Sequence, residues 1–194
     1  METGVNFCAE PGSEKTFFTS DTHFGHRLMA RERGFDGDID AMDKVLIKNW
    51  NAVVKQNDVV YHLGDFSFRK RGETLGILHQ LNGRIRFIRG NHDGVVKGEV
   101  LSCFEWQKSY YVAKAPDNGK IILAHFPFEV WDKSHYGSWH LHGHCHGSLR
   151  TTRDIKRIDV GVDTNDLKPY SMEEIEAIMA KRGYEAVDHH TKRR

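Results

Sequence analysis

Short apolar runs alternate with polar segments along this chain, and several runs end in Asp, His or Asn. The stretches KTFFTSD (15–21), DVVYHLGD (58–65) and RIRFIRGNHD (84–93) are rich in β-branched and aromatic residues, which predicts buried strands. KIILAHFP (120–127) and SWHLHGHCHG (138–147) repeat the design. In each stretch the polar residues follow the apolar ones, so we expect them at strand ends.

Apolar residues at helical spacing separate some of these strands. From Asp40 onward they recur every three or four positions, which predicts a helix with one buried face, capped by Asp40. A shorter helix is expected before Gly83, which would close it. Near the C-terminus, Ser171 and Glu174 form a capping box ahead of another helix, which Gly183 is expected to end.

The alternation of strands and helices predicts an α/β fold, in which ligands commonly bind beyond the strand ends. The 194 residues are enough for one domain with a sizeable core. We therefore expect a single domain over residues 16–185, with a flexible leader (1–15) before it and a flexible tail (186–194) after it.

The composition, 39% hydrophobic and 28% charged, is typical of globular proteins. No apolar run approaches the roughly 18 residues that span a bilayer, so we expect a cytoplasmic protein without a membrane partner. Basic residues exceed acidic ones by only one, 28 against 27, which does not indicate stable nucleic-acid binding. Three cysteines without a CxxC pair argue against a disulfide framework or a zinc finger. The oligomeric state is not predicted.

Many of the 13 histidines cluster at the predicted strand ends, together with Asp and Asn. Asp21 and His23 are two positions apart, as are His144 and His146, so in an extended segment both members of a pair would lie on one side of the backbone. Gly64 would allow a sharp turn that presents Asp65 to two cations. These pairs are candidate metal ligands.

Asn91 and His125 add an oxygen and a nitrogen ligand to this set. So many mixed ligands are too many for one tetrahedral ion and suit two octahedral-like ions that share a carboxylate. We expect two divalent metal ions per chain, with Mn as the first candidate and Fe, Zn, Ni or Co as alternatives.

Five blocks, DTH (21–23), GD (64–65), GNHD (90–93), AHFP (124–127) and GHCH (143–146), resemble in order the motifs of calcineurin-like metallophosphoesterases. Flanking phrases such as YHLGDF and VGVDTNDLKPYSMEEI are similar to a small bacterial and phage branch of that family. The resemblance implies a two-sheet β-sandwich flanked by helices, a four-layer αββα fold. It also implies one metal held by Asp21, His23, Asp65 and His146, and another held by Asp65, Asn91, His125 and His144.

Such a centre predicts a phosphoesterase in which a hydroxide shared by the two ions attacks the phosphorus atom. His92 follows Asn91 directly and is expected to face the substrate and protonate the leaving oxygen, with Asp93 orienting it. The resemblance implies the same role for His92. A chain this short leaves little sequence for a capping domain, so the open site favours phosphodiesters or nucleotides as substrates.

Two other functions are less compatible with the sequence. A catalytically silent protein-interaction scaffold would not need the complete ligand set and His92. A histidine-rich metal carrier would not distribute its histidines over five strand ends together with Asp and Asn.

Several further residues have both a functional and a structural interpretation. His26 and Arg27 could bind the substrate phosphate or lie in a solvated helix start. Segment 69–71 (RKR) could steer anions or form a solvated face. Aromatic residues between the last two blocks could stack on a base or pack in the core: Trp131, Tyr136 and Trp139.

Other residues are expected to support the site or the core. Asp163 could accept a hydrogen bond from a ligand histidine. His140 and His142 could contact the ligands or substrate, or occupy ordinary strand-edge positions. His62 is expected to be a core histidine, and Cys145 a buried free thiol.

Overall fold

The computed structural model describes residues 14–150 and 153–186. Its architecture is two facing β-sheets with flanking helices, which confirms the predicted α/β class. Apart from Glu14, Lys15 and Ala186, the predicted leader and tail lie outside the described residues. Among the helices of the described residues, none is long and apolar enough to cross a membrane.

The first sheet has the strand order β4-β3-β2-β1-β9. Strands β1 to β4 are parallel and β9 is antiparallel to β1. Their bounds are β1 Thr16–Thr19, β2 Val59–His62, β3 Arg84–Ile88, β4 Trp106–Lys108 and β9 Tyr170–Ser171. Parallel strands place their C-terminal ends at one edge of the sheet, so the polar segments that follow β1, β2 and β3 meet there.

The second sheet has the order β5-β6-β7-β8. Strands β6, β7 and β8 are parallel, and β5 is antiparallel to β6. Their bounds are β5 Tyr110–Lys114, β6 Lys120–Ala124, β7 Trp139–His142 and β8 Arg157–Asp159. A parallel bridge between Ser20 and Gly161 connects the two sheets just beyond β1 and β8. This connection brings the ends of both sheets together.

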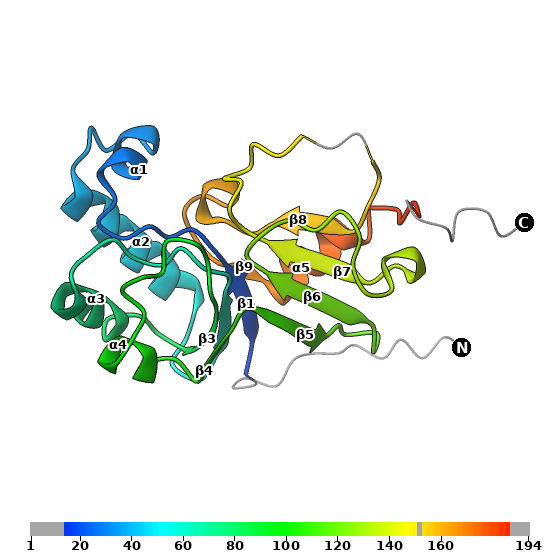
Figure 1. The fold of residues 1–194 in the computed structure, drawn as a ribbon, viewed down its shortest axis with the longest axis horizontal. Helices are drawn as coiled ribbons and strands as arrows, with labels where there is room; N and C mark the ends of the chain where they lie inside the picture. Colours follow the sequence, from blue (N-terminus) through cyan, green and yellow to red (C-terminus); the bar gives the residue numbers. More distant parts are fainter. Residues whose placement is uncertain (1–13, 151–152, 187–194) are drawn as a thin grey trace, which may run out of the picture.

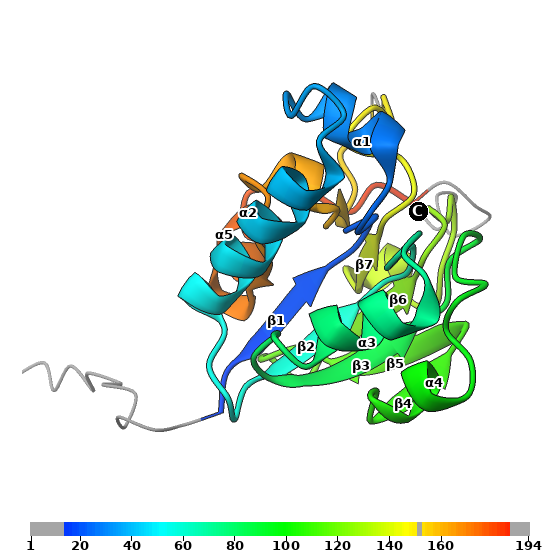
Figure 2. The ribbon, with the colours of Figure 1, turned by 90° about the vertical axis from the view of Figure 1, so that its left-hand side faces the viewer.

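Four helices lie on the side of the first sheet that faces away from the second (Figure 1): α1 Arg27–Glu32, α2 Ile39–Val53, α3 Arg71–Leu78 and α4 Glu99–Ser102. Figure 2 looks onto this helical layer, with the parallel strands behind it. Alternate strand residues separate two cores, because Phe17 packs toward the helices and Phe18 toward the second sheet. Helix α5 (Met172–Met179) packs into the core between the sheets through Ile175 and Met179.

Two short 3₁₀ helices, Ser134–Tyr136 and Val162–Thr164, complete the described elements. The outer face of the second sheet is covered by a small cluster in which Phe128, Trp131 and Ile155 pack on Ile122. Ile122 is fully buried there, so the cluster shields the centre of this face, whereas Val112 on the edge strand β5 is 36% exposed.

The helix boundaries differ from the predictions in three places. Asp38 caps α2 instead of Asp40, and its side chain accepts hydrogen bonds from the backbone N–H groups of Asp40 and Ala41. Helix α3 ends at Leu78, well before Gly83, which lies in a left-handed turn (φ 91°) that leads into β3. The Ser171–Glu174 capping box is confirmed, but α5 ends before Gly183.

Helix α5 ends at Met179, with Ala180 as its C-cap, so the N–H group of Gly183 is free to bond elsewhere. That group donates to Asp154 Oδ1 at 2.7 Å, so Gly183 fixes the segment after the helix to the loop before β8.

Candidate metal centre

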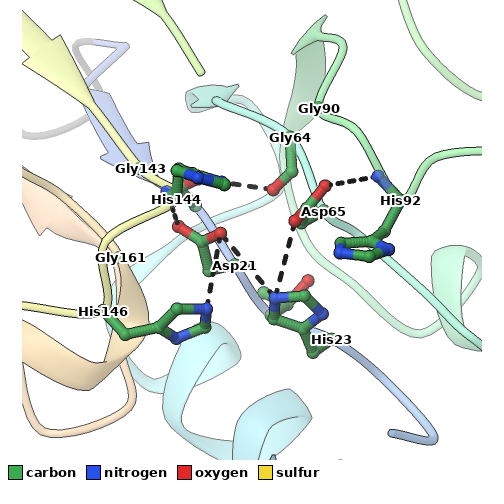
Figure 3. Close-up of polar contacts among 12 residues, drawn as sticks. Asp21, His23, Gly64, Asp65, Gly90, His92, Gly143, His144, His146 and Gly161 are labelled. Carbon is green, nitrogen blue, oxygen red and sulfur yellow. Dashed lines mark hydrogen bonds and ion pairs between the residues drawn. The ribbon is translucent and has the colours of Figure 1, made fainter. Parts of the chain in front are cut away.

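The predicted metal ligands come together where the two sheets meet. Asp21 and His23 follow β1, and Asp65 follows β2. Asn91 follows β3, whereas the other three follow strands of the second sheet: His125 after β6, and His144 and His146 after β7. In Figure 3 the side chains of Asp21, His23, Asp65 and His146 converge on one region.

Six of these side chains form two groups, each able to hold a metal ion. In each group, one possible ligand atom per residue lies within 4.8 Å of the others: Asp21, His23 and His146 in the first, and Asp65, His125 and His144 in the second.

Asp65 connects the two groups. Its Oδ2 lies 3.7 Å from His23 Nε2 in the first group and 3.5 Å from His125 Nε2 in its own. Asn91 Oδ1 lies 3.0 Å from His125 Nε2, beside the second group. This division matches the two ligand sets that the resemblance implied; binding itself stays a prediction.

The backbone at these residues is not extended, contrary to the reasoning from alternation. Asp21, His23, Asp65, His144 and His146 all have left-handed φ values, between 48° and 70°. Such conformations are uncommon outside glycine and cost about 1–3 kcal/mol each when strained. Backbone hydrogen bonds hold them in place, including that from Asp21 N–H to the Gly64 carbonyl (2.9 Å) and from His23 N–H to the Asp65 carbonyl (3.0 Å). The surrounding fold therefore fixes where the side chains point.

Several buried polar atoms of the first group have no hydrogen-bond partner among the described residues. They are Asp21 Oδ1 and both ring nitrogens of His23. The other oxygen of Asp21 accepts from the backbone N–H of His144 at 2.9 Å. An unpaired buried polar atom costs roughly 1–3 kcal/mol. A cation coordinated by these atoms would remove that cost, so the residues fit a metal ion.

Burial also sets the protonation of this group. It raises the pKa of Asp21 to about 6 and lowers the pKa of His23 to about 2. His23 is therefore neutral at pH 7, and an imidazole nitrogen lone pair is available for a metal. The positive charge of a bound ion would favour the ionised form of Asp21.

Asp163 supports His146 from outside the centre. Its Oδ2 lies 2.7 Å from His146 Nδ1. This contact raises the pKa of His146, against the effect of burial. Burial alone would raise the pKa of Asp163, but hydrogen bonds from Arg33 and His146 lower it. With Nδ1 directed at the carboxylate, Nε2 of His146 is left to face the first group.

Arg33, at the end of α1, was not predicted as part of the site. Its Nε and Nη2 donate to the two oxygens of Asp163 at 2.7 and 2.8 Å. Nη2 also donates to the carbonyl of Asp21 at 2.7 Å, and Nη1 to that of Thr22 at 2.8 Å. Arg33 thus ties Asp163 to the backbone of the first ligand block. No motif in the sequence marks it, because its carboxylate partner Asp163 lies 130 residues away along the chain.

His92 lies beside the centre, as expected, but Asp93 does not orient it. The His92 backbone N–H donates to Asp65 Oδ1 at 2.8 Å, and its side chain is exposed. Asp93 is buried, and its carboxylate accepts from the backbone N–H groups of Asp65 (2.9 Å), Gly90 (2.6 Å) and Phe66 (2.8 Å). The prediction for Asp93 was wrong because three backbone donors occupy this carboxylate, which fixes the two loops together.

The two predicted substrate contacts have different surroundings. His26 caps α1 through Nδ1, and its ring lies 5.4 Å from that of His23 and 4.1 Å from that of Phe68. Arg27 is exposed, and its Cγ lies 3.5 Å from where a Cβ would stand at Gly37. The structure brings His26 to the centre, and the substrate-binding roles of both residues stay predictions.

Three further histidines, His62, His140 and His142, are buried near the sheets. His62 is fully buried, with Nε2 3.0 Å from Thr22 Oγ1 and Nδ1 accepting from Gly64 N–H at 3.2 Å, which confirms a satisfied core histidine. His140 accepts from Phe128 N–H at 2.9 Å and lies 3.0 Å from the Ile122 carbonyl. His142 is buried and its Nδ1 lies 2.8 Å from the Gly143 carbonyl.

Arg69 is not available for steering anions, because Asp43 and Asp40 bind its guanidinium. Trp131 and Trp139 pack in the two hydrophobic clusters of the second sheet, as the structural interpretation held, whereas Tyr136 is 75% exposed. Cys145 is a free thiol, half-buried instead of buried.

Comparison with known proteins gives four related results. A family model for calcineurin-like phosphoesterases matches residues 15–192. An uncharacterised protein of Methanocaldococcus jannaschii is 36% identical over 177 residues, covering 86% of this chain and 92% of that protein. The gene 66 protein of Mycobacterium phage L5 is 32% identical over 181 residues, covering 76% of this chain and 86% of that protein. A solved protein of unknown function from Aquifex aeolicus has 25% identity and a TM-score of 0.62, over 86% of this chain and 100% of that chain.

Proposed function

Since the chain belongs to the calcineurin-like phosphoesterase family, we propose that it is a dinuclear-metal phosphoesterase that hydrolyses phosphodiesters or nucleotides. The observation that carries this proposal is the position of Asp65 between two groups of candidate metal ligands. A carboxylate in that place is able to bind both ions of a pair.

Two divalent ions, if held by these residues, would lower the pKa of a shared water and would bind the phosphoryl oxygens. The chain itself sets the charge. Asp21 and Asp65 contribute two carboxylates and burial keeps His23 neutral, so a centre holding two divalent ions would retain positive charge and would attract a phosphate ester. Mn²⁺ is the first candidate, with Fe, Zn, Ni and Co as alternatives, because mixed N and O ligands accept all of them.

His92 is the proposed proton donor. During hydrolysis the oxygen of a hydroxide bonds to phosphorus, the ester P–O bond breaks, and the leaving oxygen takes a proton from the protonated His92 ring. This ring lies 6.0 Å from that of His23, and the backbone of His92 is fixed by its hydrogen bond to Asp65. The side chain therefore stands beside the ligands, where a leaving oxygen could reach it.

The test is hydrolysis of bis-p-nitrophenyl phosphate and p-nitrophenyl phosphate by metal-stripped protein reloaded with Mn²⁺. Asp65→Asn removes a charge that both groups share and is expected to abolish activity. Asp166→Asn, the same change at an exposed carboxylate, is the matched control and should retain it. Metal content measured on each variant shows whether a loss of activity follows a loss of ions.

The outcomes separate the alternatives. If the diester is hydrolysed faster than the monoester and Asp65→Asn abolishes this activity, the proposed phosphodiesterase is supported. Faster hydrolysis of the monoester points to a phosphatase. Two bound ions without Asp65-dependent hydrolysis by any divalent metal would favour the catalytically silent scaffold. The cytoplasmic location and the absence of stable nucleic-acid binding stay predictions from the sequence.

A further inference from the structure

Two exposed phenylalanines stand directly beside the candidate metal centre. Phe68 is 42% exposed and Phe126 is 46% exposed. A ring left in water at the rim of a charged site loses the favourable burial that Phe usually gains. Both rings nevertheless rest on histidines of the centre, so their exposed faces are presented to whatever binds there.

Phe68 lies on the side of the proposed proton donor. Its ring centroid is 5.2 Å from that of His92, 5.5 Å from that of His23 and 4.1 Å from that of His26. Its backbone N–H donates to the carbonyl of Phe24 at 2.8 Å, which fixes the base of the side chain. A leaving group that receives its proton from His92 would therefore emerge next to the Phe68 ring.

Phe126 lies beside the second ligand group. Its ring centroid is 5.0 Å from that of His125 and 4.7 Å from that of His144. The carbonyl of the preceding residue, His125, accepts from Gly143 N–H at 2.9 Å, so this loop is also fixed. In this structure Phe126 has ring contacts with ligands of the second group, whereas Phe68 contacts a ligand of the first. The two rings thus flank different ends of the centre.

We infer that Phe68 and Phe126 bind the two organic groups of a phosphodiester, Phe68 the leaving group and Phe126 the group retained on phosphorus. This inference rests on the proposed function and narrows its substrate class to diesters with a planar group, such as a nucleobase or an aryl ring, on each side of the phosphate. Aromatic rings stack on such groups without reading their hydrogen-bond pattern.

The experiment compares two diesters with the same leaving group: bis-p-nitrophenyl phosphate, whose retained group is an aryl ring, and methyl p-nitrophenyl phosphate, whose retained group is methyl. Phe126→Leu removes the ring and keeps an apolar side chain. It should lower kcat/KM for the bis-aryl diester by about tenfold relative to the methyl diester. Phe68→Leu should lower kcat/KM for both diesters by a similar factor, because both lose the same leaving-group contact.

A binding measurement makes the result independent of turnover. The Kd of metal-loaded protein for diphenyl phosphate, measured by calorimetry, should rise by about tenfold in either variant, while binding of dimethyl phosphate should not change. Tyr184→Leu, at an exposed tyrosine (55%) with no proposed role, is the matched control and should leave both quantities unchanged.

The two proposals fail in different ways. If the wild type hydrolyses neither diester but both Phe variants weaken diphenyl phosphate binding, the proposed hydrolysis is rejected, while the assignment of Phe68 and Phe126 as binding residues is supported. The inference about the phenylalanines is overturned if the wild type is active, Phe126→Leu keeps the ratio of the two diesters, Phe68→Leu keeps kcat/KM for both, and neither variant changes the Kd for diphenyl phosphate. An equal loss in Tyr184→Leu would overturn it as well.

Discussion

The carboxylate of Asp163 lies 2.7 Å from Nδ1 of His146 and accepts two hydrogen bonds from Arg33. A candidate ligand is thereby joined through one aspartate to a helix that contributes no predicted metal ligand. The same guanidinium donates to the backbone carbonyls of Asp21 and Thr22, so it also holds the backbone of the first ligand block. The orientation of His146 and the backbone of Asp21 therefore depend on one ion pair.

Asp163→Asn is expected to weaken metal binding by about tenfold or more, since the charge that orients His146 is lost. Titration calorimetry with Mn²⁺ measures this, and Asp166→Asn, at an exposed position, is the control. Unchanged affinity in Asp163→Asn, with the control also unchanged, would show that His146 does not need this carboxylate.

Gly143→Ala should destabilise the protein and weaken metal binding together. A Cβ there would stand 2.0 Å from Ser20 Oγ and 2.3 Å from Asp21 Oδ2, so the candidate ligand would have to move. We expect a loss of about 2 kcal/mol in the free energy of unfolding, as for overpacked cores. Gly76→Ala is the control, because nothing lies within 4 Å of its Cβ in α3, and it should gain about 0.5–1 kcal/mol. Chemical denaturation of both variants measures the free energy of unfolding, and titration calorimetry with Mn²⁺ measures metal binding.

The ends of the strands could be predicted because local patterns determine them. Apolar runs at 15–21 and 58–65 lead into Asp21 and Asp65, and parallel pairing then brings the two ends together. The prediction of α2 missed only its cap, because Asp38 and Asp40 are equally good capping residues and the apolar spacing does not choose between them.

The conformation and surroundings of the ligands could not be predicted in the same way. Left-handed φ values at Asp21 and His23 arise from hydrogen bonds to the loop after β2, which a local pattern does not contain. Asp93 was misread because its three backbone donors come from that loop and from its own turn. Phe68 and Phe126 look like ordinary apolar residues in the sequence, and only the fold reveals that they are exposed beside the centre.

The stability of metal-free protein should depend on pH partly through His140. Burial lowers the pKa of His140 to about 3, from 6.5 for a free histidine, so the unfolded chain binds a proton more readily than the folded one. Its contribution is fully present above pH 6.5 and is lost as the pH falls from 6.5 toward 3, by up to about 1.4 kcal/mol per pH unit.

Replacement of His140 by Gln tests this dependence. The wild type should be more stable than His140→Gln at pH 8, where two hydrogen bonds of the imidazole are intact, and the difference should shrink at pH 4.5. Denaturation in the presence of a chelator measures both values. His79→Gln, at an exposed histidine, is the control. If the stability difference between the wild type and His140→Gln is the same at pH 8 and pH 4.5, His140 is not a buried neutral imidazole.

His92→Ala should separate proton donation from metal binding. The His92 side chain is exposed and none of its ring atoms belongs to the two ligand groups, so metal content should stay at the wild-type value. Loss of a proton donor matters most when the leaving oxygen is strongly basic, and general acid catalysis contributes about 10²–10⁴-fold. We therefore expect a large fall in kcat for an alkyl ester and a much smaller one for a p-nitrophenyl ester. Equal losses on both esters, with two ions still bound, would assign His92 to positioning the substrate instead of protonating it.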